Sequence, residues 1–241
     1  EFAKYEQPFI LANFNGTSAD VDVLTHEAGH ALTLKVMYDV AKRQNKSWHL
    51  PAVVNFITLD PRGSFGGAMY FKESENEEQS FEKTMSEIVS DYGGHSCENI
   101  LYDMQGSWGI TQDMETASNA AYTAVLRMGM GAKTGVKHTP YGDFISESKK
   151  EMIEKDVDNI TSTAKMISDM IIEEYKDFIL QFTEKYYSKV ATGECIIPSE
   201  DFDKMLNDWK EAQTPEKLKE LDNLEIKIID MLEKCKKGEA Q

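Results

Sequence analysis

The chain has 241 residues, of which 41% are hydrophobic and 28% are charged. This length and composition suit one large folded domain or two small ones and exclude a disordered chain. Its 42 acidic residues against 26 basic ones give a formal net charge of −16. We therefore expect no nucleic-acid partner and no anionic membrane surface, because both need positive patches on the protein.

The cysteines and the apolar runs indicate in which cellular compartment we expect the protein. Cys97, Cys195 and Cys235 have no zinc or redox spacing, and reduced thiols favour a cytoplasmic or organelle-matrix side. No apolar run approaches the roughly 18 residues that a membrane span needs. Because the sequence does not begin with Met, we interpret it as a processed or excised domain, whose longer parent is compatible with a membrane anchor.

The first elements along the chain are a helix and a hairpin. After an extended stretch at residues 1–16, apolar side chains recur at helical spacing from residue 18 to about residue 41. Residues 53–59 and 68–71 are then rich in β-branched and aromatic side chains, and the letters "DPRGSFGG" between them have turn chemistry. These features predict a small β-hairpin.

Two more helices are predicted in the middle of the chain. The first covers residues 80–102 and is interrupted by Gly93-Gly94. Such a pair costs a helix roughly 2 kcal/mol relative to alanine, so we expect another helix to approach closely there. After a loop at residues 105–112, a compact alanine-rich helix follows over residues 113–128.

The C-terminal part of the sequence is nearly all helical in character. Apolar periodicity runs through residues 152–190, and a short helix follows Pro198 and Ser199. Thr214 and Pro215 then open a last amphipathic helix, since proline suits the first helical position.

The stretch "HEAGH" at residues 26–30 carries the chemistry. On a helix, His26 and His30 share one face and reach one metal ion, and the carboxylate of Glu27 lies beside it. Zinc lowers the pKa of a bound water to about 7, and Glu27 is the base that takes its proton during attack on a peptide carbonyl. Gly29 weakens a helix by about 1 kcal/mol, which indicates close packing beside the metal. The sequence therefore predicts one catalytic Zn²⁺ per chain.

The third zinc ligand is open at this level, although a catalytic zinc normally has three protein ligands. Residues 31–36 read "ALTLKV", which excludes the metzincin pattern with its third histidine. Chemical type alone leaves six candidates: His49, Glu87, Asp91, His95, Glu98 and Asp113.

Residues 24–208, approximately, resemble the peptidase domain of FtsH-type ATP-dependent zinc metalloproteases. "HEAGHAL" is similar to the zinc helix of that family, and "VVNFITLDPRGSFGGAMYF" is similar to its strand–Pro-Arg-Gly–strand segment. "SEIVSDYGGHSCENILYD" looks like its Gly-Gly helix, and "GSWGITQDM" looks like the segment that supplies its third ligand. The order of these motifs carries the resemblance more than the individual letters.

The resemblance implies both a fold and a ligand set. The fold is mainly α, a zincin-like peptidase domain with a small β-hairpin or sheet near the zinc helix and a C-terminal helical bundle. Asp113 matches the third zinc ligand, and Glu98 matches an acidic position beside the site or an alternative ligand. Residues 1–145 would be the zinc-binding region, and residues 146–241 a helical region packed on it in one continuous domain.

The resemblance also implies partners. The family's peptidase domain normally follows an ATPase module that feeds it unfolded proteins, and its members form hexameric rings. No "GxxxxGK[ST]" phosphate loop occurs in this sequence, so we expect the ATPase upstream in a longer chain or in a partner. Protein or peptide substrates would pair as an added strand with Gly67, Ala68, Met69 and Tyr70, although a plain hairpin explains the same residues.

A second, shorter resemblance concerns residues 7–31, which look like the zinc-helix region of oligoendopeptidase F among the thimet-like oligopeptidases. That group takes its third ligand from a Glu about 25 residues after the motif, and the corresponding window around Phe56 contains no Glu. The FtsH-type interpretation is therefore preferred. The alternatives are a thimet-like oligopeptidase for short peptides and a catalytically silent helical assembly module, although the latter does not explain an intact motif.

Overall fold

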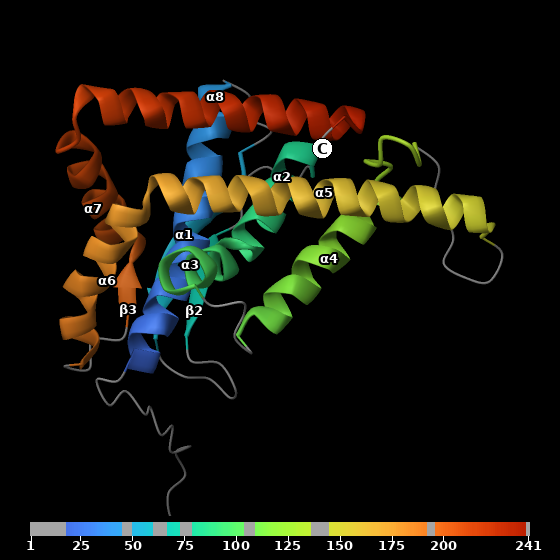
Figure 1. Ribbon diagram of the computed structural model, residues 1–241. Coiled ribbons are helices and arrows are strands. Elements are labelled where there is room, and N and C mark those ends of the chain that lie inside the picture. Colours follow the sequence, from blue (N-terminus) through green and yellow to red (C-terminus); the bar gives the residue numbers. More distant parts are fainter. Residues whose placement is uncertain are drawn as a thin grey trace, which may run out of the picture.

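The computed structural model describes residues 18–44, 50–59, 67–72, 79–103, 109–135, 145–191 and 196–239. These residues form a mainly helical structure with one small three-stranded sheet at its side (Figure 1). The predicted fold class, mainly α with a small sheet beside the zinc helix, is therefore confirmed. The extended stretch predicted at residues 1–16 lies outside the described residues.

Helix α1 (Ser18–Arg43) runs through the centre of the molecule (Figure 1). Helices α2, α3 and α6 and the first two strands pack around it. A helix that is covered on several sides needs apolar or small residues on more than one face, and Leu24, Ala28 and Leu32 are fully buried. The HEAGH motif thus lies in the interior of the fold rather than on its surface.

The sheet has the strand order β2-β1-β3, with both pairs antiparallel. β1 (Val53–Thr58) and β2 (Ala68–Lys72) form the predicted hairpin, in which Ile57 pairs with Met69. The third strand, β3 (Ile196–Pro198), comes from far along the chain and was not predicted. β2 therefore lies at one edge of the sheet, and both hairpin strands contact α1.

The predicted helix over residues 80–102 is two helices, α2 (Phe81–Asp91) and α3 (Gly93–Tyr102). α3 crosses α1 at very short distance. A Cβ atom added to Gly29 would lie 2.4 Å from the carbonyl oxygen of Gly93, and one added to Gly93 would lie 2.5 Å from the carbonyl oxygen of Gly29. The glycines allow two helix backbones to touch, which is the close approach that the sequence predicted.

The remaining helices complete the fold. α4 (Ile110–Leu126) packs on α2 and α5, and α5 (Glu147–Glu174) also contacts α1 and α3. The long C-terminal helices α5 and α8 lie side by side at the top of Figure 1. The bounds of the others are α6 Lys176–Ala191, α7 Ser199–Glu211 and α8 Pro215–Lys237.

Two predicted boundaries differ from the structure. α4 begins at Ile110, so residues 110–112 are helical instead of part of a loop. The apolar periodicity of residues 152–190 is divided between α5 and α6, which meet at Tyr175. Tyr175 is buried beside Trp209, so the chain bends where a large side chain enters the core.

The hydrophobic core is contiguous and contains side chains from all eight helices of the described residues. Its aromatic part joins α6 to α7 through Phe178, Phe182 and Phe202, whose ring centroids are 5.2–6.0 Å apart. This core includes residues on both sides of position 145. None of the described helices combines the length and the apolar character required to cross a membrane.

Candidate metal centre

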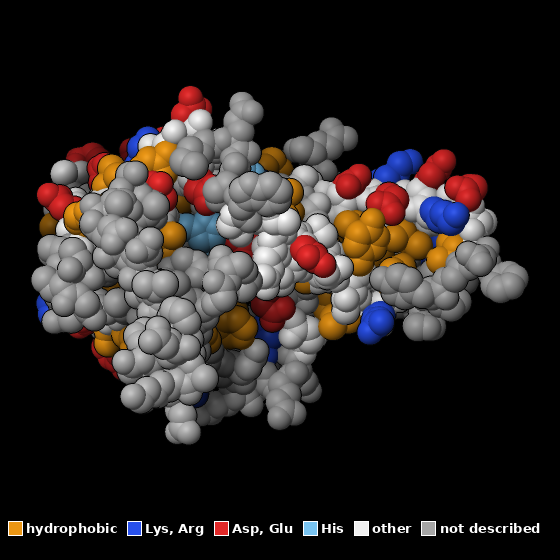
Figure 2. All heavy atoms as spheres, turned by 90° about the horizontal axis from the view of Figure 1, so that it is seen from below, with side chains coloured by type: hydrophobic (Ala, Val, Ile, Leu, Met, Phe, Trp, Pro, Cys, Tyr) orange, Lys and Arg blue, Asp and Glu red, His pale blue; other side chains and the backbone are white. Residues whose placement is uncertain are grey.

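Helix α1 supplies the three residues of the HEAGH motif that carry polar side chains. His30 and Glu27 are buried, and the side chain of His26 is 12% exposed. Because the histidines are four residues apart, their rings lie on the same face of the helix, with centroids 4.7 Å apart. Figure 2, which views the molecule from below, shows histidine side chains (pale blue) next to acidic side chains (red) near the middle of this face.

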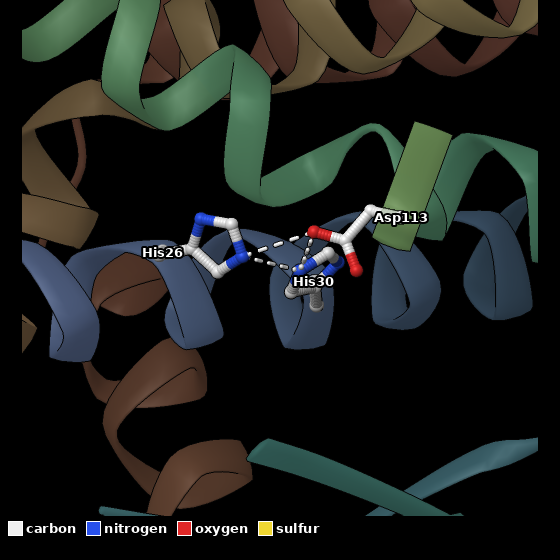
Figure 3. Close-up of side chains that lie close together, drawn as sticks. All are labelled: His26, His30 and Asp113. Carbon is white, nitrogen blue, oxygen red and sulfur yellow. Dashed lines mark hydrogen bonds and ion pairs between the residues drawn. The ribbon is translucent and has the colours of Figure 1, made fainter. Parts of the chain in front are cut away.

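Asp113 lies in the first turn of α4 and points toward both histidines (Figure 3). Its Oδ2 atom is 3.1 Å from Nε2 of His26 and 3.5 Å from Nε2 of His30. The two Nε2 atoms are 3.0 Å apart. Three ligand atoms from two helices therefore face one point.

The other nitrogen of each imidazole has its own partner. Nδ1 of His30 donates to the backbone carbonyl oxygen of Ser90 at 2.6 Å, and Nδ1 of His26 donates to Oε1 of Glu98 at 2.9 Å. Partners of this kind fix the ring orientation and place the proton on Nδ1. The Nε2 atoms are then the ring nitrogens that face Asp113 and one another, where a metal ion would replace the shared protons.

The distances fit a zinc ion. Zinc bonds nitrogen and oxygen at about 2.0–2.2 Å, so ligand atoms of a tetrahedral site are about 3.2–3.6 Å apart. The three separations of 3.0, 3.1 and 3.5 Å agree with this range to within a few tenths of an ångström. In the part of the chain that the structure describes, no other group of three His, Cys, Asp or Glu side chains converges in this way.

The three side chains are strongly coupled in the absence of a metal. Burial lowers the pKa of His26, but its hydrogen bonds to Asp113 and Glu98 outweigh this effect and raise the pKa to about 10. Burial raises the pKa of Asp113, but its hydrogen bonds with the two histidines hold that pKa well below its usual range. A metal ion replaces the proton in such a cluster, so its binding releases protons.

Glu27 lies between the histidines and the sheet. Burial raises the pKa of its carboxyl group, and the neighbouring His30 and His26 oppose this rise. The backbone of Met69 in β2 also gives this carboxylate a hydrogen bond. The candidate base therefore lies beside the predicted substrate strand, residues 67–70.

The structure also places the other candidate ligands. Glu98 is buried on α3 and contacts Nδ1 of His26, on the far side of the ring from the convergent atoms. Asp91, at the end of α2, has its pKa raised to about 7 by burial, although the charge of His30 opposes this. Neither Asp91 nor His95 belongs to the convergent group within the described residues, and His49 lies outside those residues.

Two features of the site were not predicted from sequence. The carbonyl group of Ser90 orients His30, and a carbonyl group is present in every residue, so it gives no sequence signal. Gly94 packs against His26, since a Cβ atom added there would lie 2.4 Å from the ring. The glycine pair signalled this contact, although its partner was not identifiable without the fold.

An HExxH helix buried beside a small sheet, with a carboxylate from another helix facing it, defines a zincin-type metallopeptidase domain. Comparison with known proteins refines this class. Residues 20–193 match the sequence profile of peptidase family M41, and the chain belongs to that family.

Curated relatives agree with the family. The chain is 34% identical over 112 residues to the ATP-dependent zinc metalloprotease FtsH of Buchnera aphidicola, covering 46% of this chain and 16% of that protein. It is 27% identical over 235 residues to the FtsH of Mycoplasmopsis pulmonis, covering 91% of this chain and 30% of that protein. It is 28% identical over 159 residues to FtsH 1 of a Thermoanaerobacter species, covering 65% and 23%.

The chain therefore spans less than a third of the length of these relatives. The expectation of an FtsH-type peptidase domain with zinc as its metal is confirmed by the family and by the names of these proteins. The resemblance of residues 7–31 to oligoendopeptidase F stays a prediction.

Proposed function

We propose that this domain hydrolyses peptide bonds in protein substrates, with zinc held by His26, His30 and Asp113 and with Glu27 as the general base. The observation that carries the proposal is the convergence of three ligand atoms at 3.0–3.5 Å beside a buried carboxyl group on the same helix. This donor set, two imidazoles and one carboxylate, is that of a hydrolytic zinc site with an open position.

Each residue has a distinct task in this mechanism. A bound zinc ion supplies a Lewis acid that lowers the pKa of water and polarises a carbonyl group. Glu98 and the carbonyl of Ser90 hold the Nδ1 protons and so keep both Nε2 atoms directed at the metal. The Glu27 carboxylate accepts the proton of the attacking water and delivers it to the leaving amine.

The sheet edge offers a way to hold the substrate. Within the described residues, β2 lies at one end of the strand order, and an edge strand is where an extended peptide can add to a sheet. A hydrogen bond joins Met69 of this strand to Glu27, so a peptide strand added here would run close to the proposed base. Recognition through the backbone would tolerate many side chains.

The partners follow from the relatives, which are named ATP-dependent. We propose that an ATPase module, in a longer chain or in a partner, feeds unfolded protein to this domain. We further propose a homo-oligomer, a hexameric ring, on the cytoplasmic or organelle-matrix side.

Two substitutions test the site. Glu27→Gln removes the base but no ligand, so we expect about one zinc per chain and a loss of peptide cleavage of about 10²–10⁴-fold. Asp113→Ala removes a ligand, so we expect loss of both zinc and cleavage. Zinc is measured by elemental analysis of the purified protein, and cleavage is measured with a fluorogenic peptide.

Asp177→Ala is the matched control for Asp113→Ala. Asp177 is also an aspartate in the first turn of a helix, but it is exposed and lies on α6. Its substitution should leave zinc content and cleavage unchanged. Full zinc and full activity in Asp113→Ala would show that another residue is the third ligand.

A further inference from the structure

A pocket of about 610 Å³ lies beside the metal centre, between the starts of α3 and α4 and the middle of α5. Two of its lining residues are sequence neighbours of the site. Met114 follows Asp113, and His95 follows Gly94, whose backbone packs against the ring of His26. The lining of the pocket therefore includes the residue that follows Asp113 and the residue that follows Gly94.

Electrostatic interactions connect the pocket to the metal centre independently of sequence adjacency. Burial lowers the pKa of His95, and the ammonium group of Lys165 lowers it further, while Asp169 and Glu98 oppose the change. The charge of His26 acts on His95 as well. His95 thus lies near Lys165 in the pocket and near His26 of the site.

The charged groups of the pocket are mostly positive, in a chain whose net charge is −16. Three lysines line it, Lys133, Lys155 and Lys165, against the two aspartates Asp156 and Asp158. Asp156 is only 1% exposed, and its carboxylate is already bonded to backbone N–H groups, whose dipoles offset part of its negative charge.

Asp156 instead fixes one wall of the pocket. Its carboxylate accepts hydrogen bonds from the backbone N–H groups of Lys133 and Thr134 at 2.6–3.1 Å. The fit is close, because a Cβ atom added to Gly131 would lie 2.5 Å from Oδ2 of Asp156. The backbone that carries Lys133 is therefore held in place before any ligand binds.

Elsewhere in the lining, an ion pair with Asp169, one helical turn away on α5, holds the side chain of Lys165. Lys165 is also mostly buried, with 22% of its side chain exposed. Asp169 offsets part of the charge of Lys165, but an ammonium group in a hollow is screened less by water than one on the open surface.

From this arrangement we propose that the pocket binds an acidic side chain of the peptide substrate, Asp or Glu, close to the scissile bond. The inference rests on the proposed peptidase function and deepens it by naming a substrate class. The volume lies within the range of ligand pockets and exceeds the needs of a glutamate side chain. Lys133 and Lys165 supply the charges, and His95, which also lines the pocket, interacts electrostatically with both Lys165 and His26.

The test uses three peptide series that differ only in Glu, Gln or Lys, placed in turn at each position flanking the scissile bond. With the zinc-loaded chain, at one of these positions we expect kcat/KM for Glu to exceed that for Gln about threefold to fivefold, the range of an ion pair near a surface. Lys should be the poorest residue there. The preference should shrink in 0.5 M salt, which screens charges within a few ångströms.

Variants assign the preference to the pocket. Lys133→Gln and Lys165→Gln should each reduce the Glu-over-Gln ratio toward one. Lys204→Gln is the matched control, since Lys204 also makes an ion pair with an aspartate four residues later, but on α7 and away from the pocket. It should leave the ratio unchanged.

Binding provides a second readout that does not depend on cleavage. Zinc-loaded Glu27→Gln protein should bind the Glu peptide more tightly than the Gln peptide, and adding Lys165→Gln should remove the difference. Equal cleavage and equal binding of the three peptides, or a preference that survives both lysine substitutions, would overturn the proposed pocket. If no peptide is cleaved, the proposed peptidase function fails, and the binding measurement decides about the pocket.

Discussion

Each histidine of the proposed zinc site depends for its orientation on a partner outside the HEAGH motif. His30 donates to a backbone carbonyl of α2, which no side-chain substitution at position 90 removes. His26 donates to the carboxylate of Glu98 on α3, which a single substitution deletes. A substitution can therefore remove the orienting partner of His26 but not that of His30.

Substitution of Glu98 tests its role as an orienting partner. Glu98→Ala frees the ring of His26, so we expect zinc affinity to fall by about 10–100-fold, the usual cost of losing such a partner. Glu98→Gln keeps an acceptor oxygen and should lose less. Affinity is measured by competition with a chromogenic chelator. If Glu98→Ala loses zinc as completely as Asp113→Ala, Glu98 is itself a ligand.

At the scale of single residues, the sequence indicated which residue types could bind a metal, but not which distant residue meets the two histidines. The spacing of His26 and His30 indicates a shared face because helix geometry is local. Asp113 lies 83 residues after His30, and residue chemistry alone left it among six candidates. The packing of α4 against α2 brings Asp113 to the histidines. The sequence does not show this packing, so Asp113 was selected only through the family resemblance. The assigned roles stay predictions.

At the scale of elements, the contact between α1 and α3 controls the site. Gly29 and Gly93 place the two backbones in contact, and the same crossing brings Gly94 against His26 and Glu98 into reach of its Nδ1 atom. The glycines weaken both helices locally, but they set the separation on which the ligand geometry depends.

Gly29→Ala is therefore expected to destabilise the protein, although helix propensity alone predicts that alanine stabilises it. Alanine stabilises a helix interior by about 1 kcal/mol relative to glycine. Here its Cβ atom would lie 2.4 Å from a backbone oxygen and 2.7 Å from Sγ of Cys97, so the helices must separate at a cost of about 1–3 kcal/mol or more.

The measurement for this prediction is urea unfolding of the purified chain. We expect a lower midpoint for Gly29→Ala and a weaker zinc affinity in the same variant. Asn119→Ala, at an exposed position of α4, is the control for propensity alone and should change the stability by at most about 0.5 kcal/mol. A Gly29→Ala protein as stable as the parent would contradict the close crossing.

Strand β3 and the helix breaks show what local sequence leaves undetermined. A strand of three residues carries too little alternation to be recognised, and β3 exists because residues 196–198 reach β1 in space. The break at Tyr92 follows from the α1–α3 contact, and the break at Tyr175 from packing against Trp209. In contrast, Thr214 caps α8 as predicted, because capping is local.

The edge strand β2 gives a prediction about substrates. If a peptide adds to this edge as a strand, its backbone N–H groups alternate between pairing with β2 and pointing away. N-methylation at successive positions of a peptide substrate should therefore reduce cleavage with a period of two residues. Cleavage rates of the methylated series measure this, and the unmethylated peptide is the control. A uniform effect along the peptide would argue against strand addition.

At the scale of the whole molecule, the position of the site determines which substrates fit. The three proposed ligands and Glu27 are buried or mostly buried between α1, α4 and the sheet, so we expect a peptide bond to reach them only within an extended segment. A folded protein rarely presents such a segment, since its backbone groups are already paired. The relatives named ATP-dependent are several times longer than this chain.

We therefore expect the zinc-loaded chain to cleave an unfolded protein and short peptides without ATP, and to leave the folded form of the same protein intact. A disulfide-stabilised protein offers both forms with one sequence, reduced and unfolded or oxidised and folded, and gel analysis follows its loss. Zinc-loaded Glu27→Gln is the control for contaminating proteases. Cleavage restricted to short peptides would favour a thimet-like oligopeptidase, because only that class excludes long chains. Equal cleavage of both protein forms would mean that the site is reachable without an extended segment, which contradicts its burial between α1, α4 and β2.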